Sequence, residues 1–487
     1  MIKKMKQKSL KLNFIMNAIL TMSSFIFPLI TFPYVSRILQ PVGTGRVAFA
    51  TSLITYFNMF AQLGIPTYGV RACAKVRDNR EELTRTAHEL LFINLFMSLL
   101  SYIGLGAALF FIPRLREEKA LYLVISLTIF LSAVGMEWLY KALEQYTYIT
   151  VRSITFKFAA LIAMFLLVHE KDDYVIYGGI TIFASSASNI FNWIHARKYI
   201  DRKWIGNYHI KKHLKAIFIF FSMACATMIY TNLDAVMLGF MKTDEDVGYY
   251  NAAVKIKTIL VSIVTSLGTV LLPRVSYYVE HGQMDKFREI SAKALNFVVL
   301  AAVPLMIYFM IFARYGIYFL SGSAYEGSIL PMQIIMPTLL FIGITNILGI
   351  QILVPLGKEK IVLYSEIAGA VTDLILNTLL IPPFASAGAA LGTLAAEFVV
   401  LIVQYAALKD LVKNLFQKIS YGKIVTGILL GILGSVWIRG LPLGNFAILL
   451  ISAVFFFGIY GAVLLISKEE LTVELTDQIL RKMLHRK

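Results

Sequence analysis

Charged residues and cysteines are both scarce in this chain. Only 15% of its 487 residues are Asp, Glu, Lys or Arg, whereas soluble domains carry about 25%. The two cysteines, Cys73 and Cys225, lie far apart and in no metal-binding spacing, which excludes a disulfide framework. The phosphate-binding motif G-x-x-x-x-G-K-[ST] is absent from the sequence, so we expect no ATP use by this chain. The sequence therefore predicts no cofactor and no metal.

Long apolar runs make up most of what is present. Hydrophobic residues account for 58% of the chain and the mean hydropathy is +0.71, which indicates an integral membrane protein. A membrane-spanning helix uses about 20 apolar residues, so the runs predict an all-α fold of about fourteen spans. We expect them near residues 13–37, 46–70, 88–112, 120–142, 149–168, 174–195, 214–240, 248–272, 292–313, 327–352, 361–381, 386–408, 422–440 and 444–466. The first run is too long for a signal peptide and is interpreted as a retained helix.

Basic residues gather in alternate loops of this predicted topology. The basic set comprises residues 3–11, 71–85, 196–215, 274–288, 358–360, 409–418 and 481–487. The positive-inside rule therefore places both termini in the cytoplasm of a multi-pass protein of the cell membrane. The net charge of +17 is then largely cytoplasmic, which favours contact with anionic lipid headgroups and gives no support to nucleic-acid binding.

The basic stretch at residues 196–215, ARKYIDRKWIGNYHIKKHLK, contains seven Lys or Arg and divides the chain. We expect an N-terminal six-helix bundle at residues 1–195, a basic cytoplasmic connector at 196–213, a second six-helix bundle at 214–408, two further helices at 409–466 and a cytoplasmic tail at 467–487. An offset of 203 positions matches Gly45 with Gly248, Ala50 with Ala253, Thr55 with Thr258, Arg71 with Arg274 and Arg85 with Arg288. Because six spans precede the connector, the two halves share one orientation.

Polar residues lie at helical spacing on one face of the first two spans of each half. They include Asn17 in the first span, Asn58 and Gln62 in the second, Asp234 in the seventh and Lys255 in the eighth. Lipid offers such groups no partners, so they face protein or water. Any single polar residue is explained by packing between helices, whereas four stripes at equivalent positions favour a central polar cavity.

Four basic residues fall toward the outer ends of these spans, namely Arg37, Arg46, Lys255 and Lys257. Basic side chains in such a cavity are suited to phosphate. No carboxylate is obvious beside Arg46, which favours a binding role for it. Lys255 could instead pair with Asp234, and Arg37 could equally extend to the membrane interface.

Three acids lie within apolar runs of the second half: Glu366 and Asp373 in the eleventh span and Glu397 in the twelfth. A buried acid in lipid either takes up a proton or holds a cation. These residues are therefore candidates for proton or Na⁺ coupling.

Five segments resemble the Wzx-type polysaccharide repeat-unit flippases of the multidrug/oligosaccharidyl-lipid/polysaccharide exporter superfamily. They are PLITFPYVSRILQPVGTGRVAFATSLITYF at residues 28–57, LGIPTYGVRACAKVRDNREEL at 63–83, GMEWLYKALEQYTYITVRSITFK at 135–157, LDAVMLGFMKTDEDVGYYNAAVKI at 233–256 and LGKEKIVLYSEIAGAVTDLILNTLLIPPFASAGAALGTLAAE at 356–397. The resemblance covers nearly the whole chain.

The resemblance implies two six-helix bundles in a V around a central cavity, with two helices added at the C-terminus. It implies a non-enzymatic flippase that moves undecaprenyl-diphosphate-linked oligosaccharides from the cytoplasmic to the outer leaflet, alongside a polysaccharide polymerase and glycosyltransferases. Related flippases of lipid-linked precursors use cavity cations on helices one, two and eight, and the matching candidates are Arg46, Lys255 and Lys257. The chain departs from that pattern in helix one, where no basic residue of the predicted span precedes Arg37.

Two other functions remain open on the sequence. A cation-coupled multidrug antiporter of the same superfamily would have a net acidic cavity, whereas a flippase would have a basic one. A membrane glycan polymerase would usually need a large extramembrane loop with catalytic carboxylates, and the outer loops predicted here are all short.

Overall fold

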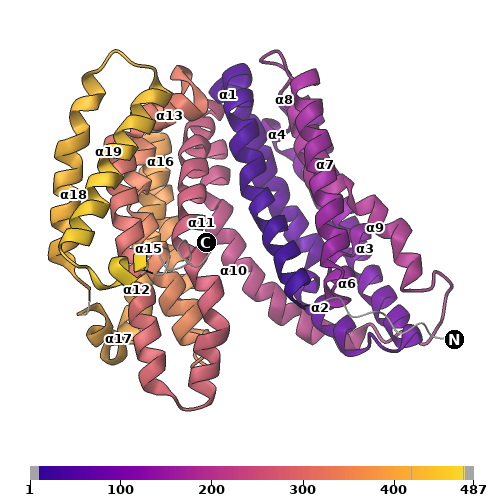
Figure 1. The fold of residues 1–487 in the computed structure, drawn as a ribbon. Coiled ribbons are helices and arrows are strands. Elements are labelled where there is room, and N and C mark those ends of the chain that lie inside the picture. Colours follow the sequence, from indigo (N-terminus) through magenta and orange to yellow (C-terminus); the bar gives the residue numbers. More distant parts are fainter. Residues whose placement is uncertain (1–9, 418, 475, 478–487) are drawn as a thin grey trace, which may run out of the picture. The chain divides into compact units, whose positions relative to one another are not determined.

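The computed structural model describes residues 10–417, 419–474 and 476–477, and that part of the chain contains helices and no strand (Figure 1). The basic residues predicted at the two ends of the chain, up to residue 9 and from 478 onward, lie outside the described residues. Eight helices in the described part are long and apolar enough to cross a membrane, or nine if one bent pair is a single span. The chain is thus an all-α, multi-pass membrane protein, and the count of fourteen spans stays a prediction.

Two compact units divide the chain, residues 1–248 and 249–487. Unit 1 contains α1 (Leu10–Gln62), α2 (Ile65–Lys75), α3 (Arg80–Phe111), α4 (Pro113–Glu117), α5 (Lys119–Gly135), α6 (Glu137–Ala142), α7 (Tyr146–Leu167), α8 (Tyr174–Ile182), η1 (Phe183–Ala187), α9 (Asn189–His195), η2 (Ala196–Lys198) and α10 (Lys211–Met241). Helix α10 belongs to unit 1 because it packs against α1 and α2. The predicted domain boundaries were based on the sequence repeat instead, and they stay a prediction.

Unit 2 begins within α11 (Asp244–Glu280), whose first residues belong to unit 1. It continues with α12 (Met284–Ile311), α13 (Ala313–Ser321), η3 (Ser323–Ser328), α14 (Ile329–Ile335), α15 (Thr338–Thr345), η4 (Asn346–Leu353), α16 (Glu359–Ala407), α17 (Lys409–Phe416), α18 (Tyr421–Ser435), η5 (Val436–Gly440) and α19 (Asn445–Ile466).

Residues with non-helical backbone angles interrupt the chain at three points: within α1, within α16 and between α5 and α6. Helix α1 holds the first predicted span and most of the second, which continues into α2, and it is broken at Gln40, whose φ of 58° is outside the helical range. Helix α16 holds the eleventh and twelfth predicted spans and is broken at Ala385, at a φ of 47°. The predicted span at 120–142 ends early, because Met136 takes a left-handed conformation between α5 and α6. Non-glycine residues rarely adopt such angles, so these breaks mark changes of chain direction.

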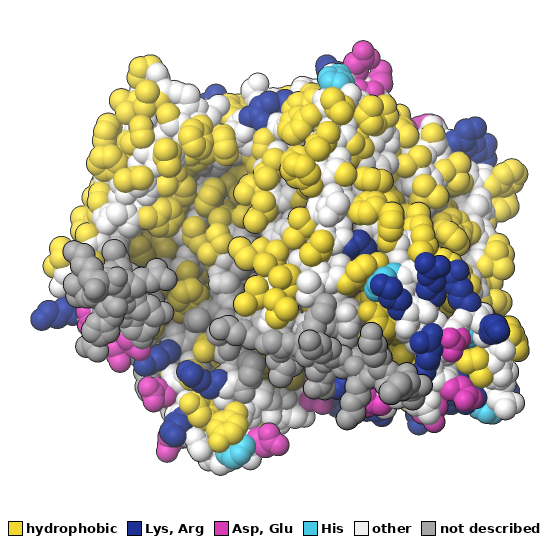
Figure 2. Space-filling model, turned by 45° about the vertical axis from the view of Figure 1, so that its right-hand side comes forward, with side chains coloured by type: hydrophobic (Ala, Val, Ile, Leu, Met, Phe, Trp, Pro, Cys, Tyr) yellow, Lys and Arg dark blue, Asp and Glu magenta, His cyan; other side chains and the backbone are white. Residues whose placement is uncertain are grey.

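Helix α3 shows how the sequence suits a membrane rather than water. Its N-terminus is capped by Asn79, whose side-chain oxygen accepts hydrogen bonds from the backbone N–H groups of Glu81 and Glu82, a favoured start for a helix. Phe96, Leu99 and Ile103 are 57–60% exposed, while the buried face carries polar side chains. An apolar outer face with a polar inner face is the reverse of a soluble helix. Figure 2 shows hydrophobic side chains covering much of one face of the molecule.

Close helix packing stabilises the C-terminal pair, α18 and α19. A Cβ at Gly427 would lie 2.9 Å from the Tyr460 ring, and one at Gly431 would lie 3.0 Å from the Phe456 carbonyl oxygen. The GxxxG pair in the sequence therefore marks helix packing rather than a binding site, as such motifs commonly do in membranes.

Candidate functional site

Arg46 lies at the centre of a group of charged and aromatic side chains that we name the Arg46 network: Arg46, Arg114, Glu118, Tyr174 and Asp244. Its guanidinium lies 3.2 Å from Glu118 Oε1 and 3.4 Å from Asp244 Oδ2. Arg114 forms a second ion pair with Asp244, at 2.5 Å. The Tyr174 hydroxyl donates to Glu118 Oε2 at 2.7 Å, and its ring lies 4.8 Å from the Arg46 guanidinium carbon. Two cations thus face two carboxylates, and the network is formally neutral.

The residues of this network are distant in sequence but all belong to unit 1. Arg46 follows the break at Gln40 in α1, Glu118 is the N-cap of α5, and Asp244 is the first residue of α11. The expectation that no carboxylate lies beside Arg46 is wrong. Both acids lie in short loops that mix basic and acidic residues, RLREEK and KTDEDVG, and this mixture of charges could have indicated ion pairing.

Asn58 and Gln62 lie one helical turn apart on α1 and form part of a buried polar row in unit 1. Gln62 Oε1 accepts a hydrogen bond from Asn94 Nδ2 at 3.5 Å, and the Ser101 hydroxyl donates to the Phe57 carbonyl at 3.0 Å. Four polar atoms here are buried without a hydrogen-bond partner among the described residues, and they are Asn58 Oδ1, Gln62 Nε2, Asn94 Oδ1 and Ser98 Oγ. Because buried polar groups are normally hydrogen-bonded, this row has unused capacity for hydroxyl or amide ligands.

The remaining candidates of the first half are more exposed. Asn17 is exposed and its carbonyl accepts a hydrogen bond from the Thr21 hydroxyl. Arg37 is also exposed and donates to the carbonyl of Pro33 on its own helix.

Asp234, Lys255 and Lys257 are placed on two different helices. Asp234 is 5% exposed on α10 in unit 1, while Lys255 and Lys257 are partly buried on α11 in unit 2. The Asp234–Lys255 pair and the binding role of the two lysines stay predictions.

The two halves of α16 bring the acids Asp373 and Glu397 into the interior of unit 2. Asp373 is 1% exposed and Glu397 is 6% exposed, whereas Glu366 is only partly buried. A Cβ at Gly392 would overlap Asn377 Oδ1 and would lie 3.1 Å from Asp373 Oδ1. This close approach shows that polar faces from both sides of the Ala385 break meet. No three His, Cys, Asp or Glu side chains in the described part of the chain are arranged to hold a metal.

Sequence reasoning missed a buried acid on α3. Glu89 is fully buried, and three groups near the start of α10 donate to its carboxylate: the His209 backbone N–H at 2.6 Å, Lys212 Nζ at 2.9 Å and His213 Nε2 at 2.7 Å. The other ring nitrogen of His213 lies 2.7 Å from the Tyr68 hydroxyl. An acid beside an apolar run was the available signal, but its partners lie about 120 positions away.

Comparisons with known proteins point to polysaccharide export. The family model described as "Polysaccharide biosynthesis protein" matches residues 10–279, and the model "MatE" matches residues 219–379. The "Putative O-antigen transporter" of Escherichia coli (strain K12) is 24% identical over 398 residues, which is 80% of this chain and 95% of that protein. The protein of the same name from Shigella dysenteriae is 25% identical over 392 residues, with 80% and 97% covered.

Among solved structures, the lipid II flippase MurJ in an inward closed conformation has the same fold. The TM-score is 0.75 at 16% sequence identity, and the alignment covers 94% of this chain and 99% of MurJ.

Proposed function

Because this chain belongs to the polysaccharide biosynthesis protein family, we propose that it is a flippase for lipid-linked oligosaccharides. It moves undecaprenyl-diphosphate-linked repeat units from the cytoplasmic to the outer leaflet for surface polysaccharide assembly. The observation that carries this proposal is the family match at residues 10–279, more than half of the chain. The O-antigen transporters that align with 80% of the chain, and the fold shared with a lipid II flippase, support transport rather than enzymatic catalysis.

The substrate chemistry is compatible with the polar residues of unit 1. A diphosphate requires cations, and the glycan requires hydroxyl and amide partners, which the Asn58–Gln62 row supplies. The polyprenyl chain can stay in lipid while the headgroup crosses. An inside-negative potential favours outward movement of an anion, by about 2.3 kcal/mol per charge for 100 mV. We propose that Arg46, Lys255 and Lys257 contact the diphosphate, with Arg37, Asp234 and Asn17 near its path.

The ion pairs of Arg46 set a condition for this role. Arg46 is engaged by Glu118 and Asp244 in the structure, so a diphosphate has to replace at least one carboxylate. A phosphate can take the place of a carboxylate here, because phosphate oxygens accept the same charge-assisted hydrogen bonds as carboxylate oxygens. The acids would then position the guanidinium between transport cycles.

Arg46→Gln is expected to slow translocation by about tenfold to a hundredfold, since hydrogen bonds to charged groups contribute about 1.5–3 kcal/mol. The measurement is the leaflet accessibility of a lipid-linked oligosaccharide in vesicles that contain the purified protein. Lys255→Ala is expected to slow the same reaction. Arg116→Gln removes an equal charge from an exposed arginine of α4 outside the network and should leave the rate within about twofold.

Glu118→Gln separates binding from a purely structural role of Arg46. If Arg46 binds the diphosphate, Glu118→Gln removes one of the two ion pairs that hold Arg46, and transport persists. Equal losses of thermal stability and transport in Glu118→Gln and Arg46→Gln would instead show that the network only holds α1 and α5 together. If the unaltered protein did not transport the oligosaccharide at all, the flippase function itself would be rejected.

We further propose that Asp373 and Glu397 couple transport to protons or Na⁺, with Glu366 as a more exposed contributor. Both acids are buried in unit 2, where a charge is costly unless it is compensated. Asp373→Asn is expected to abolish stimulation of translocation by an imposed ion gradient, whereas Asp410→Asn on the exposed surface of α17 should not. Unchanged gradient dependence in both Asp373→Asn and Glu397→Gln would end the proposal.

A cation-coupled multidrug antiporter is the alternative function, favoured by the MatE match at residues 219–379 and by these buried acids. Uptake of organic cations without oligosaccharide flipping would support it. The arrangement of two six-helix bundles around a central cavity, the inner-membrane location, the cytoplasmic termini and the cooperation with a polymerase and glycosyltransferases are proposed together with the flippase function.

A further inference from the structure

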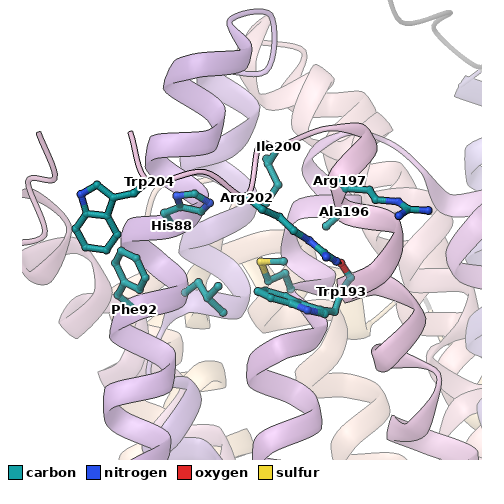
Figure 3. Close-up of a pocket in the computed structure, with 10 residues that line it drawn as sticks. His88, Phe92, Trp193, Ala196, Arg197, Ile200, Arg202 and Trp204 are labelled. Atoms are coloured by element: carbon teal, nitrogen blue, oxygen red, sulfur yellow. The ribbon is translucent and has the colours of Figure 1, made fainter. Parts of the chain in front are cut away.

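A pocket of about 230 Å³ opens where α3 meets the end of α9 and the connector that follows it (Figure 3). Its lining residues are His88, Leu91, Phe92, Met136, Trp193, Ala196, Arg197, Ile200, Arg202 and Trp204. Leu91, Met136, Ala196 and Ile200 are at most 4% exposed and form its apolar floor. The volume is below the roughly 300–1,000 Å³ of pockets that enclose a whole small molecule. The pocket therefore suits one part of a larger amphipathic ligand.

Two arginines give the mouth of the pocket a positive charge. Arg197 and Arg202 are both exposed, and none of the ten described lining residues carries a carboxylate. Arg202 donates to the Trp193 carbonyl at 3.1 Å, and its guanidinium carbon lies 5.4 Å from the Trp193 ring centroid. Figure 3 shows the Arg202 side chain extending to Trp193. This leaves a positioned guanidinium beside an apolar cavity.

The connector is anchored on both sides of the pocket, so the pocket is formed without a ligand. Arg80 of α3 pairs with Asp201 at 2.8 Å and donates to the Arg197 and Lys198 carbonyls at 3.3 Å each. On the other side, the Tyr208 hydroxyl lies 3.0 Å from His88 Nδ1. A preformed site avoids the cost of ordering a loop on binding.

Two exposed tryptophans beside the pocket indicate its environment. Trp204 is 75% exposed and Trp193 is 38% exposed. Trp is enriched where a membrane protein passes through the lipid headgroup region. Exposed Trp beside arginines, in a stretch of seven Lys or Arg, suits the surface of a leaflet that carries anionic lipids.

We propose that this pocket binds an anionic glycerophospholipid of the cytoplasmic leaflet. The phosphate lies at Arg202 and Arg197, and the adjoining glycerol and first part of an acyl chain lie against Leu91, Met136 and Ile200. The remaining chains stay in the bilayer beside Trp193 and Trp204. The site is separate from the Arg46 network, and the inference does not depend on which substrate the chain transports.

Quenching of tryptophan fluorescence by brominated lipids tests this site in the full chain. The protein is reconstituted in vesicles that contain either brominated phosphatidylglycerol or brominated phosphatidylcholine at equal bromine content. We expect the unaltered chain to be quenched preferentially by phosphatidylglycerol. Arg202→Gln should reduce that preference by about fivefold, the effect of about 1 kcal/mol per basic residue near an anionic surface.

Matched variants separate the pocket from general attraction to basic residues. Lys203→Gln removes the same charge from the neighbouring connector position, outside the pocket lining, and should keep the preference. Arg202→Lys should retain most of it, because this substitution keeps the positive charge at that position. Equal losses in Lys203→Gln and Arg202→Gln, or no loss in either, would overturn the proposal. So would full competition by soluble glycerol 3-phosphate, which would identify a free-phosphate site.

Discussion

Replacing Glu89 with alanine is expected to lower the free energy of unfolding by about 3–5 kcal/mol, the usual cost of removing one partner from a buried charged pair. The Glu89 carboxylate is fully buried and receives hydrogen bonds from His209, Lys212 and His213. Its loss leaves the buried His213 ring and the His209 amide without their acceptor. These donors lie where the connector becomes α10, so the variant should release that junction from α3.

Thermal unfolding of the purified protein in detergent measures the effect of Glu89→Ala, and limited proteolysis locates it in the connector. Glu81→Ala is the matched control on the same helix, because Glu81 is exposed and its ion pair, with Arg85 at 2.8 Å, spans one helical turn. Exposed pairs of this kind contribute about 0.3–0.5 kcal/mol. If Glu89→Ala unfolds no earlier than Glu81→Ala, the buried cluster does not hold the connector.

Patterns within a short stretch of sequence predicted the fold class. Apolar runs predicted the all-α membrane class, because a bilayer demands long apolar helices whatever their order. The family match confirms the resemblance to polysaccharide flippases. The buried positions of Gln62, Asp234, Asp373 and Glu397 agree with the rule that polar residues in apolar spans face the protein interior.

Contacts between distant residues could not be predicted in the same way. The carboxylates that engage Arg46 lie 72 and 198 positions away, at Glu118 and Asp244. Helical spacing relates residues only within one helix, so it could not predict either of these ion pairs. Glu89 illustrates the same limit, because the groups that donate hydrogen bonds to it belong to the basic connector. The charge of that connector indicated only contact with solvent or lipid.

The sequence repeat leads to an unexpected contact between its own matched positions. A Cβ at Gly45 would overlap the carbonyl oxygen of Asp244 and would lie 2.8 Å from the Gly248 nitrogen. In the same way, a Cβ at Gly248 would overlap the carbonyl oxygen of Pro41. The offset of 203 that matches Gly45 with Gly248 also matches Pro41 with Asp244. The contact is therefore reciprocal, as expected where two equivalent segments cross about a local two-fold axis.

Gly45→Ala is expected to destabilise the protein by about 3 kcal/mol or more, at the upper end of the range for overpacking, because the obstructing atoms belong to backbone rather than to a flexible side chain. Gly248→Ala should do the same. Gly106→Ala on α3 meets no atom within 4 Å and should instead stabilise its helix by about 0.5–1 kcal/mol. Thermal unfolding of the three variants gives opposite signs if the backbones of α1 and α11 touch in the membrane. A Gly45→Ala protein as stable as Gly106→Ala would show that these segments are held apart there, and that Asp244 reaches Arg46 by some other approach.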